Sequence, residues 1–207
     1  MIRIYSIAAA ALVAAMLGFL GWLVLAGRDG DDRFAQCRGT AISGGAGSIG
    51  GPFELVDQTG RTVTDADVFT MPSIVYFGYT FCPDVCPLDV ARNALAVELL
   101  EDQGDMAQPV FISVDPQRDT PEVLTQFSSV FHDRMIGLTG SEEQVRAAAR
   151  AYRMFYSVHP AEDDFYLIDH STFSYLVLPG HGFVEVFRRD QTAEQLAEQA
   201  ACFIGRM

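Results

Sequence analysis

The sequence predicts an α/β fold in which a mixed β-sheet carries helices on both faces. Residues 73–79 (SIVYFGY) are a continuous run of apolar, β-branched and aromatic residues, typical of a buried central strand, and residues 109–115 (PVFISVD) are a second predicted strand. A segment with helical spacing of its apolar residues follows each strand. Between residues 165 and 187 the chain has short runs typical of strands, and a last predicted helix follows them. This order, with strands and helices alternating, favours a mixed sheet.

The helices are predicted from apolar spacing and from capping residues. Residues 88–103 (LDVARNALAVELLEDQ) have apolar side chains at helical intervals. The other helices begin at side chains whose oxygen accepts a free backbone N–H group. They are Thr120 with Pro121 for a helix to about Phe131, Ser141 with Gln144 for a helix to about Phe155, and Thr192 with Gln195 for a helix to about Ile204.

The remaining strands are short. Residues 53–64 (FELVDQTGRTVT) are two alternating runs around Gly60, which predicts a β-hairpin ahead of the first central strand. Residues 165–169 (FYLID), 174–178 (SYLVL) and 183–187 (FVEVF) are three more predicted strands, the last two joined by the turn PGHG.

The first 28 residues differ from the rest of the chain. From Tyr5 to Gly27 there is no charged residue, a run of 23 residues. About 20 apolar residues span a bilayer core, and the h-region of a signal peptide has only about 7–15. We therefore expect a single transmembrane helix in 1–28 that anchors the protein, a cleaved signal peptide being the alternative. A flexible tether is expected over 29–50 and one folded domain over 51–207.

The charge is strongly negative. The chain has 27 acidic and 14 basic residues, a net charge of −13, and every basic residue is arginine. Such a domain repels nucleic acid, so no nucleic-acid partner is expected. The acidic surface is explained by solubility alone, although it would also suit a cationic ligand or a basic protein surface.

Residues 79–89 (YTFCPDVCPLD) hold two cysteines, Cys82 and Cys86, each followed by proline. Proline suits the first turn of a helix, which places Cys82 just before a helix and Cys86 in its first turn. Free N–H groups and the helix dipole there favour thiolate over thiol. A dicysteine at the turn from a central strand into a helix is typical of the active end of a thioredoxin-like fold.

Three uses of this pair are open: a structural disulfide, a redox pair and a metal clamp. A disulfide over so short a loop restricts the unfolded chain little, and redox sites of this fold usually have two intervening residues, whereas here there are three. A metal needs a further ligand. His170 opens the DHST loop after a predicted strand, where thioredoxin-like enzymes usually carry a cis-proline. The other histidines, His132, His159 and His181, are expected at the surface.

The segments VYFGYTFCPDVCP, FISVDPQRDTPEVL and DHSTFSYLVLPGHGFVEVF, with the opening GGPFELVDQTGRTVTDADV, together resemble the Sco/SenC family. Its members are copper-binding, membrane-anchored proteins with a thioredoxin-like fold, and the resemblance covers about residues 50–205. It implies that Cys82, Cys86 and His170 bind one copper ion per domain, as Cu(I) or Cu(II). It also implies that the domain delivers copper to the dinuclear centre of cytochrome c oxidase subunit II. Phe81 departs from the family, whose members often carry histidine there.

The leading hypothesis is thus a copper chaperone rather than an enzyme. The alternative is an extracytoplasmic thiol–disulfide oxidoreductase that uses Cys82 and Cys86 to keep the acceptor's cysteines reduced; only the chaperone needs His170. Zn²⁺ is the second candidate metal, and a peroxiredoxin-like peroxidase is disfavoured by the residues before Cys82. The expected partners are subunit II, a periplasmic copper donor protein and the membrane. The expected location is the inner membrane, in one pass, with the domain in the periplasm.

Other residues leave alternatives open. Asp169 either orients His170 or faces outward at the end of a strand. Asp84 either contacts a partner or favours the helix N-terminus. Asp115 and Asp119 are expected to hold the turn from strand to helix, with a role beside the metal as the alternative. Cys37 and Cys202 either form a disulfide, which would persist outside the cytoplasm, or remain free thiols.

Overall fold

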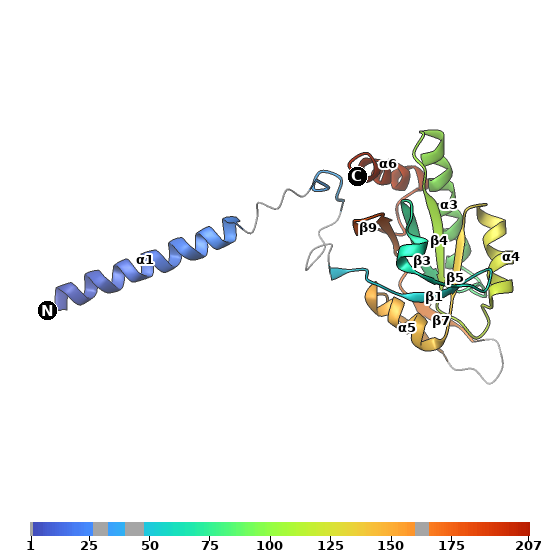
Figure 1. Cartoon of the computed structure of the whole chain (residues 1–207), viewed down its shortest axis with the longest axis horizontal. Helices are drawn as coiled ribbons and strands as arrows, with labels where there is room; N and C mark the ends of the chain where they lie inside the picture. Colours follow the sequence, from blue (N-terminus) through green and yellow to red (C-terminus); the bar gives the residue numbers. More distant parts are fainter. Residues whose placement is uncertain (1, 27–32, 40–47, 160–165) are drawn as a thin grey trace. The chain divides into compact units, whose positions relative to one another are not determined.

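The computed structural model describes residues 2–26, 33–39, 48–159 and 166–207, and the chain divides into two compact units, Met1–Ala35 and Gln36–Met207 (Figure 1). The first unit contains helix α1 (Ile2–Ala26). Among the side chains that the structure describes, no helix has the length and apolarity needed to cross a membrane. Much of the predicted tether, residues 29–32 and 40–47, lies outside the described residues.

The second unit is built on a seven-stranded mixed sheet in the order β2-β1-β5-β4-β3-β8-β9. The pairs β3–β4 and β4–β5 are parallel and the other neighbours are antiparallel, so the predicted mixed sheet is confirmed. The strands are β1 (Glu54–Asp57), β2 (Thr62–Thr64), β3 (Ser73–Gly78), β4 (Gln108–Ser113), β5 (Ile136–Thr139), β8 (Ser174–Leu178) and β9 (Gly182–Phe187).

Helices cover both faces of this sheet. Helix α3 contacts α4 and α6, whereas α5 contacts β1 on the other side (Figure 1). The helices are α2 (Asp65–Val68), α3 (Val85–Asp102), α4 (Pro121–Phe131), α5 (Glu142–Ala151) and α6 (Ala193–Ile204). Thr120, Ser141 and Thr192 cap α4, α5 and α6 as predicted, each accepting a hydrogen bond from a backbone N–H of the first turn.

The predicted N-terminal hairpin is also present. Strands β1 and β2 pair around Gly60, whose φ of 84° lies in the left-handed region that glycine tolerates. The Asp57 carboxylate closes the turn by accepting from the backbone N–H groups of Thr59 and Arg61 at 2.8 and 3.1 Å. The hairpin adds to the sheet by pairing β1 with β5, a strand that the sequence did not predict.

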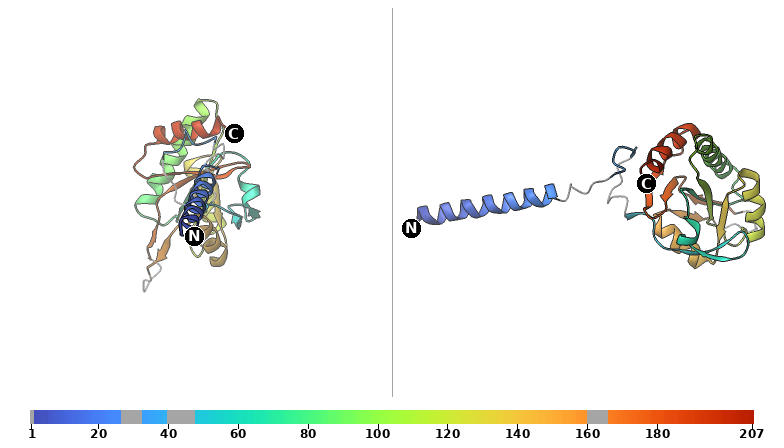
Figure 2. Two further views of the ribbon diagram at one scale, coloured as in Figure 1. Left: turned by 90° about the vertical axis from the view of Figure 1, so that its left-hand side faces the viewer. Right: turned by 45° about the horizontal axis from the view of Figure 1, so that its top comes forward.

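The region after α5 differs most from expectation. The helix ends at Ala151 rather than near Phe155, because Arg153 has a positive φ of 52° and breaks the helical path. The freed residues form β6 (Tyr156–Val158), which pairs with β7 (Ile168–His170). Strand β7 therefore begins later than the predicted 165–169. It belongs to a separate two-stranded sheet, which projects from the domain in Figure 2.

The central strands position the functional residues. All six residues of β3 are buried, as the continuous apolar run predicted, and all six of β4 are buried too. Because these two strands are parallel, their carboxyl ends lie at one edge of the sheet. The dicysteine segment follows β3 at this edge, and the loop of residues 114–120 follows β4 beside it.

The second cysteine pair lies elsewhere. Cys37 and Cys202 form a disulfide across a sequence separation of 165, which confirms the bridged alternative. The residues beside Cys37 bind β9: the Arg38 guanidinium donates to the Val184 carbonyl and the Gly39 N–H donates to Glu185, both at 2.8 Å. This part of the predicted tether is thus bonded to the domain.

Candidate metal centre

The two cysteines of the dicysteine segment approach each other at the start of α3. Strand β3 ends at Gly78, and a turn follows in which the Cys82 N–H donates to the Tyr79 carbonyl at 3.2 Å. Helix α3 begins at Val85, so Cys82 precedes the helix and Cys86 lies in its first turn, as predicted. The Cys86 backbone N–H points at the Cys82 sulfur, with an N–Sγ distance of 3.4 Å. Both cysteines are free thiols.

His170 completes a group of three donors. The two Sγ atoms and an imidazole nitrogen all lie within 4.8 Å of one another. The Cys86 Sγ is 3.2 Å from Nε2 of His170, although 84 residues separate them. In the described part of the chain no other group of three histidine, cysteine or acidic donors is close enough to hold a metal ion. The structure thus brings together the three residues that the sequence singled out.

The imidazole is held with its free nitrogen toward the sulfurs. Nδ1 of His170 lies 3.0 Å from the Ser171 carbonyl oxygen, which can only accept, so Nδ1 carries the proton. The lone pair of Nε2 is therefore available to a ligand beside Cys86. The rings of Tyr76 and Tyr79 pack edge-on against the imidazole, each at a centroid distance of 6.0 Å.

Asp169 faces away from this group. In the β6–β7 pair His170 lies opposite Tyr156 and Asp169 lies opposite Ser157, and alternate residues of a strand point to opposite faces. The Asp169 carboxylate accepts from Nε2 of His159 at 2.6 Å, and both side chains are exposed. The outward-facing alternative is the one observed, and Ser171 holds the imidazole instead of Asp169.

The two thiols differ in acidity. Burial opposes ionisation of Cys82, but the backbone N–H groups of Asp84, Cys86 and Val85 outweigh it and lower the pKa of the Cys82 thiol. Burial raises the pKa of the Cys86 thiol strongly, and the neighbouring Cys82 adds to the effect. Cys82 is 9% exposed and Cys86 is fully buried. The pair thus combines a thiol whose acidity is increased by backbone N–H groups with a fully buried thiol whose acidity is decreased.

Burial also lowers the pKa of His170, which keeps the imidazole neutral. A neutral imidazole can bind a metal through Nε2, and in the metal-free protein Nε2 can accept a hydrogen bond from the Cys86 thiol. Metal binding would displace the thiol proton, because a thiol ligates as thiolate.

Gly78 makes room for the buried sulfur. A Cβ atom at this position would lie 2.9 Å from the Cys86 Sγ and 2.9 Å from the Tyr76 ring. Real Cβ atoms do not approach other atoms so closely, so a larger residue would displace Cys86. The sequence analysis missed this role, although a glycine inside a buried apolar strand is a signal of close approach.

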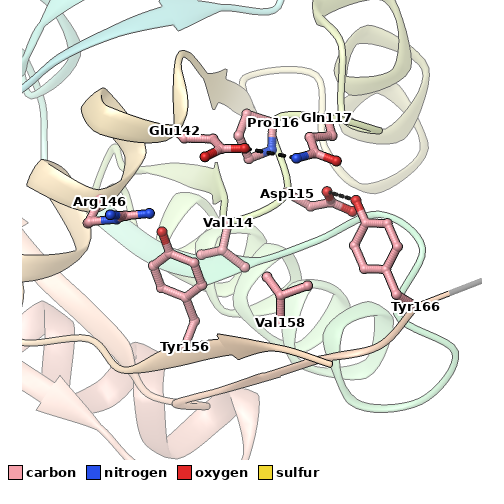
Figure 3. Close-up of a pocket in the computed structure, with 9 residues that line it drawn as sticks. All are labelled: Val114, Asp115, Pro116, Gln117, Glu142, Arg146, Tyr156, Val158 and Tyr166. Atoms are coloured by element: carbon pink, nitrogen blue, oxygen red, sulfur yellow. Dashed lines mark hydrogen bonds between the residues drawn. The ribbon is translucent and has the colours of Figure 1, made fainter. Parts of the chain in front are cut away.

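The loop after β4 lies beside the dicysteine turn. Asp115 accepts from Nε of Arg118 at 2.5 Å and from the Tyr166 hydroxyl at 2.6 Å, and the Asp119 N–H donates to the Asp115 carbonyl. The predicted role of Asp115 in the turn from strand to helix is thus observed, whereas within this segment the Asp119 carboxylate accepts only from the Ser113 hydroxyl at the end of β4. Figure 3 shows a pocket that residues of this loop line, where Gln117 donates to Glu142. Its volume is about 280 Å³. None of the three donors lines this pocket.

Phe81 is the departure from the family pattern at this site. Its side chain is 53% exposed, and the Arg118 guanidinium lies 5.0 Å from the ring centroid. The ring therefore packs on a cation at the surface rather than adding a fourth donor. Asp84 is the N-cap residue of α3, but its carboxylate accepts no capping hydrogen bond from the first turn of the helix.

Comparisons with known proteins support one family. The SCO1/SenC family model matches residues 43–205. Protein SenC of Rhodobacter capsulatus is 49% identical over 199 residues, which are 96% of this chain and 89% of the relative. The mitochondrial SCO1 homolog 1 of Arabidopsis thaliana is 40% identical over 157 residues, which are 75% of this chain but 47% of the relative. The crystal structure of Arabidopsis thaliana ScoI with copper bound has a TM-score of 0.71 and 39% identity, and covers 75% of this chain and 98% of that chain. The chain belongs to the SCO1/SenC family, with the thioredoxin-like fold of its solved members.

Proposed function

We propose that this protein binds one copper ion through Cys82, Cys86 and His170 and delivers it to the dinuclear copper centre of cytochrome c oxidase subunit II. The observation that carries the proposal is the donor geometry: two sulfurs and a lone-pair nitrogen within 4.8 Å of one another. Support also comes from the Arabidopsis relative with copper bound, and from the Sco family as assembly proteins of cytochrome c oxidase.

The chemistry of the donors favours copper. Thiolate sulfur selects Cu(I), and imidazole with thiolate also suits Cu(II). A structural Zn²⁺ site is closed by four protein ligands, whereas the described residues bring three together here. Three ligands leave a position for the incoming ligand of an acceptor. Delivery by ligand exchange requires such a position, so the incomplete set supports transfer rather than permanent storage.

A second function, reduction of the acceptor's cysteines, is favoured by the unequal thiols. The lowered pKa of Cys82 makes it the attacking thiolate, and the buried Cys86 would then close the disulfide. In that reaction Cys82 and Cys86 lose two electrons and two protons to the partner disulfide. His170 is not needed as a ligand for this exchange, which gives a way to separate the two functions.

The test is His170→Ala in the full chain. Two thiolates can still hold Cu(I), but Cu(II) needs the nitrogen donor, so Cu(II) affinity and the thiolate–Cu(II) charge-transfer absorption should fall most. His159→Ala is the matched control, since it removes an exposed histidine that directly follows β6, the partner strand of β7. Copper binding is measured by titration against a competing chelator, and thiol–disulfide exchange by reaction with a small disulfide.

Cells carrying only the His170→Ala protein should then lack copper in the oxidase, while the protein still exchanges thiols. Cells with His159→Ala should assemble the oxidase normally. Normal oxidase copper in the His170→Ala cells at limiting copper would contradict delivery through His170 and would favour the reductase.

We also propose that α1 anchors the protein in the inner membrane with the domain in the periplasm. Support comes from the uncharged run from Tyr5 to Gly27 and from the disulfide, which persists outside the cytoplasm. N-terminal sequencing of the membrane fraction tests this. A soluble mature protein that begins after Gly27 would show a cleaved signal peptide instead.

A further inference from the structure

Asp119 is a buried carboxylate beside the candidate metal centre that does not belong to its donors. The side chain is fully buried. Its Oδ2 accepts from the Thr80 backbone N–H at 3.0 Å and from the Ser113 hydroxyl at 2.5 Å. Its Oδ1 accepts from the Thr80 hydroxyl at 2.5 Å. Two of the three donors are thus on one residue, 39 positions earlier in the chain.

In the sequence Thr80 lies between Tyr79, which contacts the metal centre, and Cys82, which belongs to it. It is a central residue of the turn that the hydrogen bond from the Cys82 N–H to the Tyr79 carbonyl closes. Cys82 is one proposed ligand. Tyr79 packs its ring on His170, another proposed ligand, and its hydroxyl accepts from the Ile168 N–H at 3.3 Å. A shift of Thr80 would therefore move both Cys82 and Tyr79, and through Tyr79 it would affect the packing of His170.

The same loop also contacts the other central residue of this turn. Arg118 lies over the ring of Phe81, at 5.0 Å, and its guanidinium is fixed by Asp115. Residues 118 and 119 thus touch both residues that connect Tyr79 to Cys82. The parallel pairing of β3 and β4 makes this possible, because it brings the two loops to the same edge of the sheet.

A buried carboxylate costs free energy unless each oxygen is hydrogen-bonded. Here both carboxylate oxygens accept hydrogen bonds. Two of the three bonds come from Thr80 rather than from the loop that contains Asp119. We infer that Asp119 is a positioning residue of the metal centre, whose carboxylate holds Thr80 and thereby the turn that aims the Cys82 sulfur. The inference rests on the proposed copper site and adds to it a residue that is remote from the ligands in sequence.

The test compares three variants of the full chain. Asp119→Ala removes all three hydrogen bonds and should weaken Cu(II) binding about tenfold, the lower end of the effect of residues that orient ligands. Its thiolate–Cu(II) absorption should also shift, since the sulfur is displaced. Asp119→Asn should bind close to wild type, because the amide oxygen can accept from the Thr80 N–H and Ser113 while its NH₂ group donates to the Thr80 hydroxyl. Asp57→Ala is the matched control, a buried carboxylate at the end of β1, which two strands, β5 and β4, separate from β3.

The three variants separate positioning from other roles. Equal loss of copper affinity in Asp119→Ala and Asp119→Asn would show that the charge matters rather than the hydrogen bonds, and would overturn the inference. So would an unchanged affinity and spectrum in Asp119→Ala. Where Asp119→Ala does not fold, Thr80→Val decides: it should weaken Cu(II) binding about fivefold through the loss of one hydrogen bond, whereas Thr80→Ser should not.

Amide hydrogen exchange in the metal-free protein provides a readout that is independent of copper. Exchange at the Thr80 and Cys82 N–H groups should be faster in Asp119→Ala and unchanged in Asp57→Ala. Wild-type protein that binds no copper would contradict the proposed function, and the exchange rates would then decide the inference alone. Unchanged exchange at both amides would overturn it.

Discussion

The chain contains two pairs of cysteines that differ in almost every respect. Cys37 and Cys202 are 165 positions apart and are joined in a disulfide. Cys82 and Cys86 are four positions apart and remain free thiols beside an imidazole. The first pair joins the segment before the domain to the last helix, and the second lies at the carboxyl end of the central strands.

The difference lies in the neighbours of each sulfur. Around Cys37 they are structural: Gln199 donates to its carbonyl and Arg206 to its sulfur, both at 3.1 Å. Around Cys82 backbone N–H groups lower the pKa of the thiol, and around Cys86 a buried environment raises it. Nε2 of His170 lies 3.2 Å from the Cys86 sulfur. The first pair therefore stabilises the fold, whereas the second lies among groups that shift thiol acidity and beside an imidazole nitrogen.

The largest expected effects are those of replacing each pair of cysteines by serine, because one pair should control copper affinity and the other the stability of the fold. The double variant Cys82→Ser, Cys86→Ser should lose copper affinity by more than about 100-fold, since even residues that only orient a ligand contribute about 10–100-fold. The double variant Cys37→Ser, Cys202→Ser should keep its copper affinity but lose about 2–4 kcal/mol of the free energy of unfolding. Chelator competition and urea denaturation measure the two quantities.

Either of two results would contradict the distinction between a structural pair and a metal-binding pair. Copper binding that requires Cys37 and Cys202 would mean that the disulfide positions the metal site. Unchanged stability after its removal would mean that the hydrogen bonds of residues 36–39 to the domain suffice.

A smaller effect is expected from Gly78→Ala. The added methyl group would lie 2.9 Å from the Cys86 sulfur, so the sulfur must move. Overpacking of this kind costs about 1–3 kcal/mol of folding free energy, and copper affinity should fall about tenfold because a ligand is displaced. Thermal unfolding and copper titration measure the two effects.

Gly137→Ala supplies the matched control. A Cβ at Gly137 would lie 2.8 Å from the Ser128 hydroxyl and 3.1 Å from a Leu124 atom, so the crowding is similar but remote from the sulfurs. Both variants should be less stable, and only Gly78→Ala should bind copper more weakly. Equal copper affinity in the two would contradict the role assigned to Gly78.

The smallest expected effect is a difference in the rate at which the two free thiols, Cys82 and Cys86, are alkylated. Alkylation by iodoacetamide requires the thiolate, and the pKa of Cys82 is lowered below the ordinary value of 9.0 while that of Cys86 is raised. Near neutral pH Cys82 should thus be labelled first, and its labelling should fall only when the pH drops through this lowered pKa. Mass spectrometry of the peptide that contains both residues, after partial labelling, measures the ratio. Preferential labelling of Cys86 would reverse the assigned acidities.

Local sequence signals predicted a large part of the fold. The capping residues Thr120, Ser141 and Thr192 act within one turn, so the helix starts could be read from neighbouring residues. The continuous apolar run of residues 73–79 identified β3, because a strand with parallel neighbours is buried on both faces, and residues 109–115 identified β4 as a strand. The donor residues were found because a short, specific motif and a distant histidine matched the pattern of a known family.

What the sequence did not predict depends on contacts between distant residues. Strands β5 and β6 have four and three residues, and their partners in the sheet decide their conformation rather than their own composition. The hydrogen bonds of Asp119 to Thr80 and the space that Gly78 leaves for Cys86 join residues from separate elements. Asp169 was ambiguous because its direction depends on the register of β7, which only the pairing with β6 defines.

The central claim is that Cys82, Cys86 and His170 together form one copper site. X-ray absorption at the copper edge of the loaded full chain tests it most directly, since it identifies the atoms bound to the metal. The account predicts two sulfur atoms and one imidazole nitrogen in the wild-type protein, and loss of that nitrogen in His170→Ala but not in His159→Ala. Copper without sulfur ligands, or an identical spectrum in wild type and His170→Ala, would contradict it.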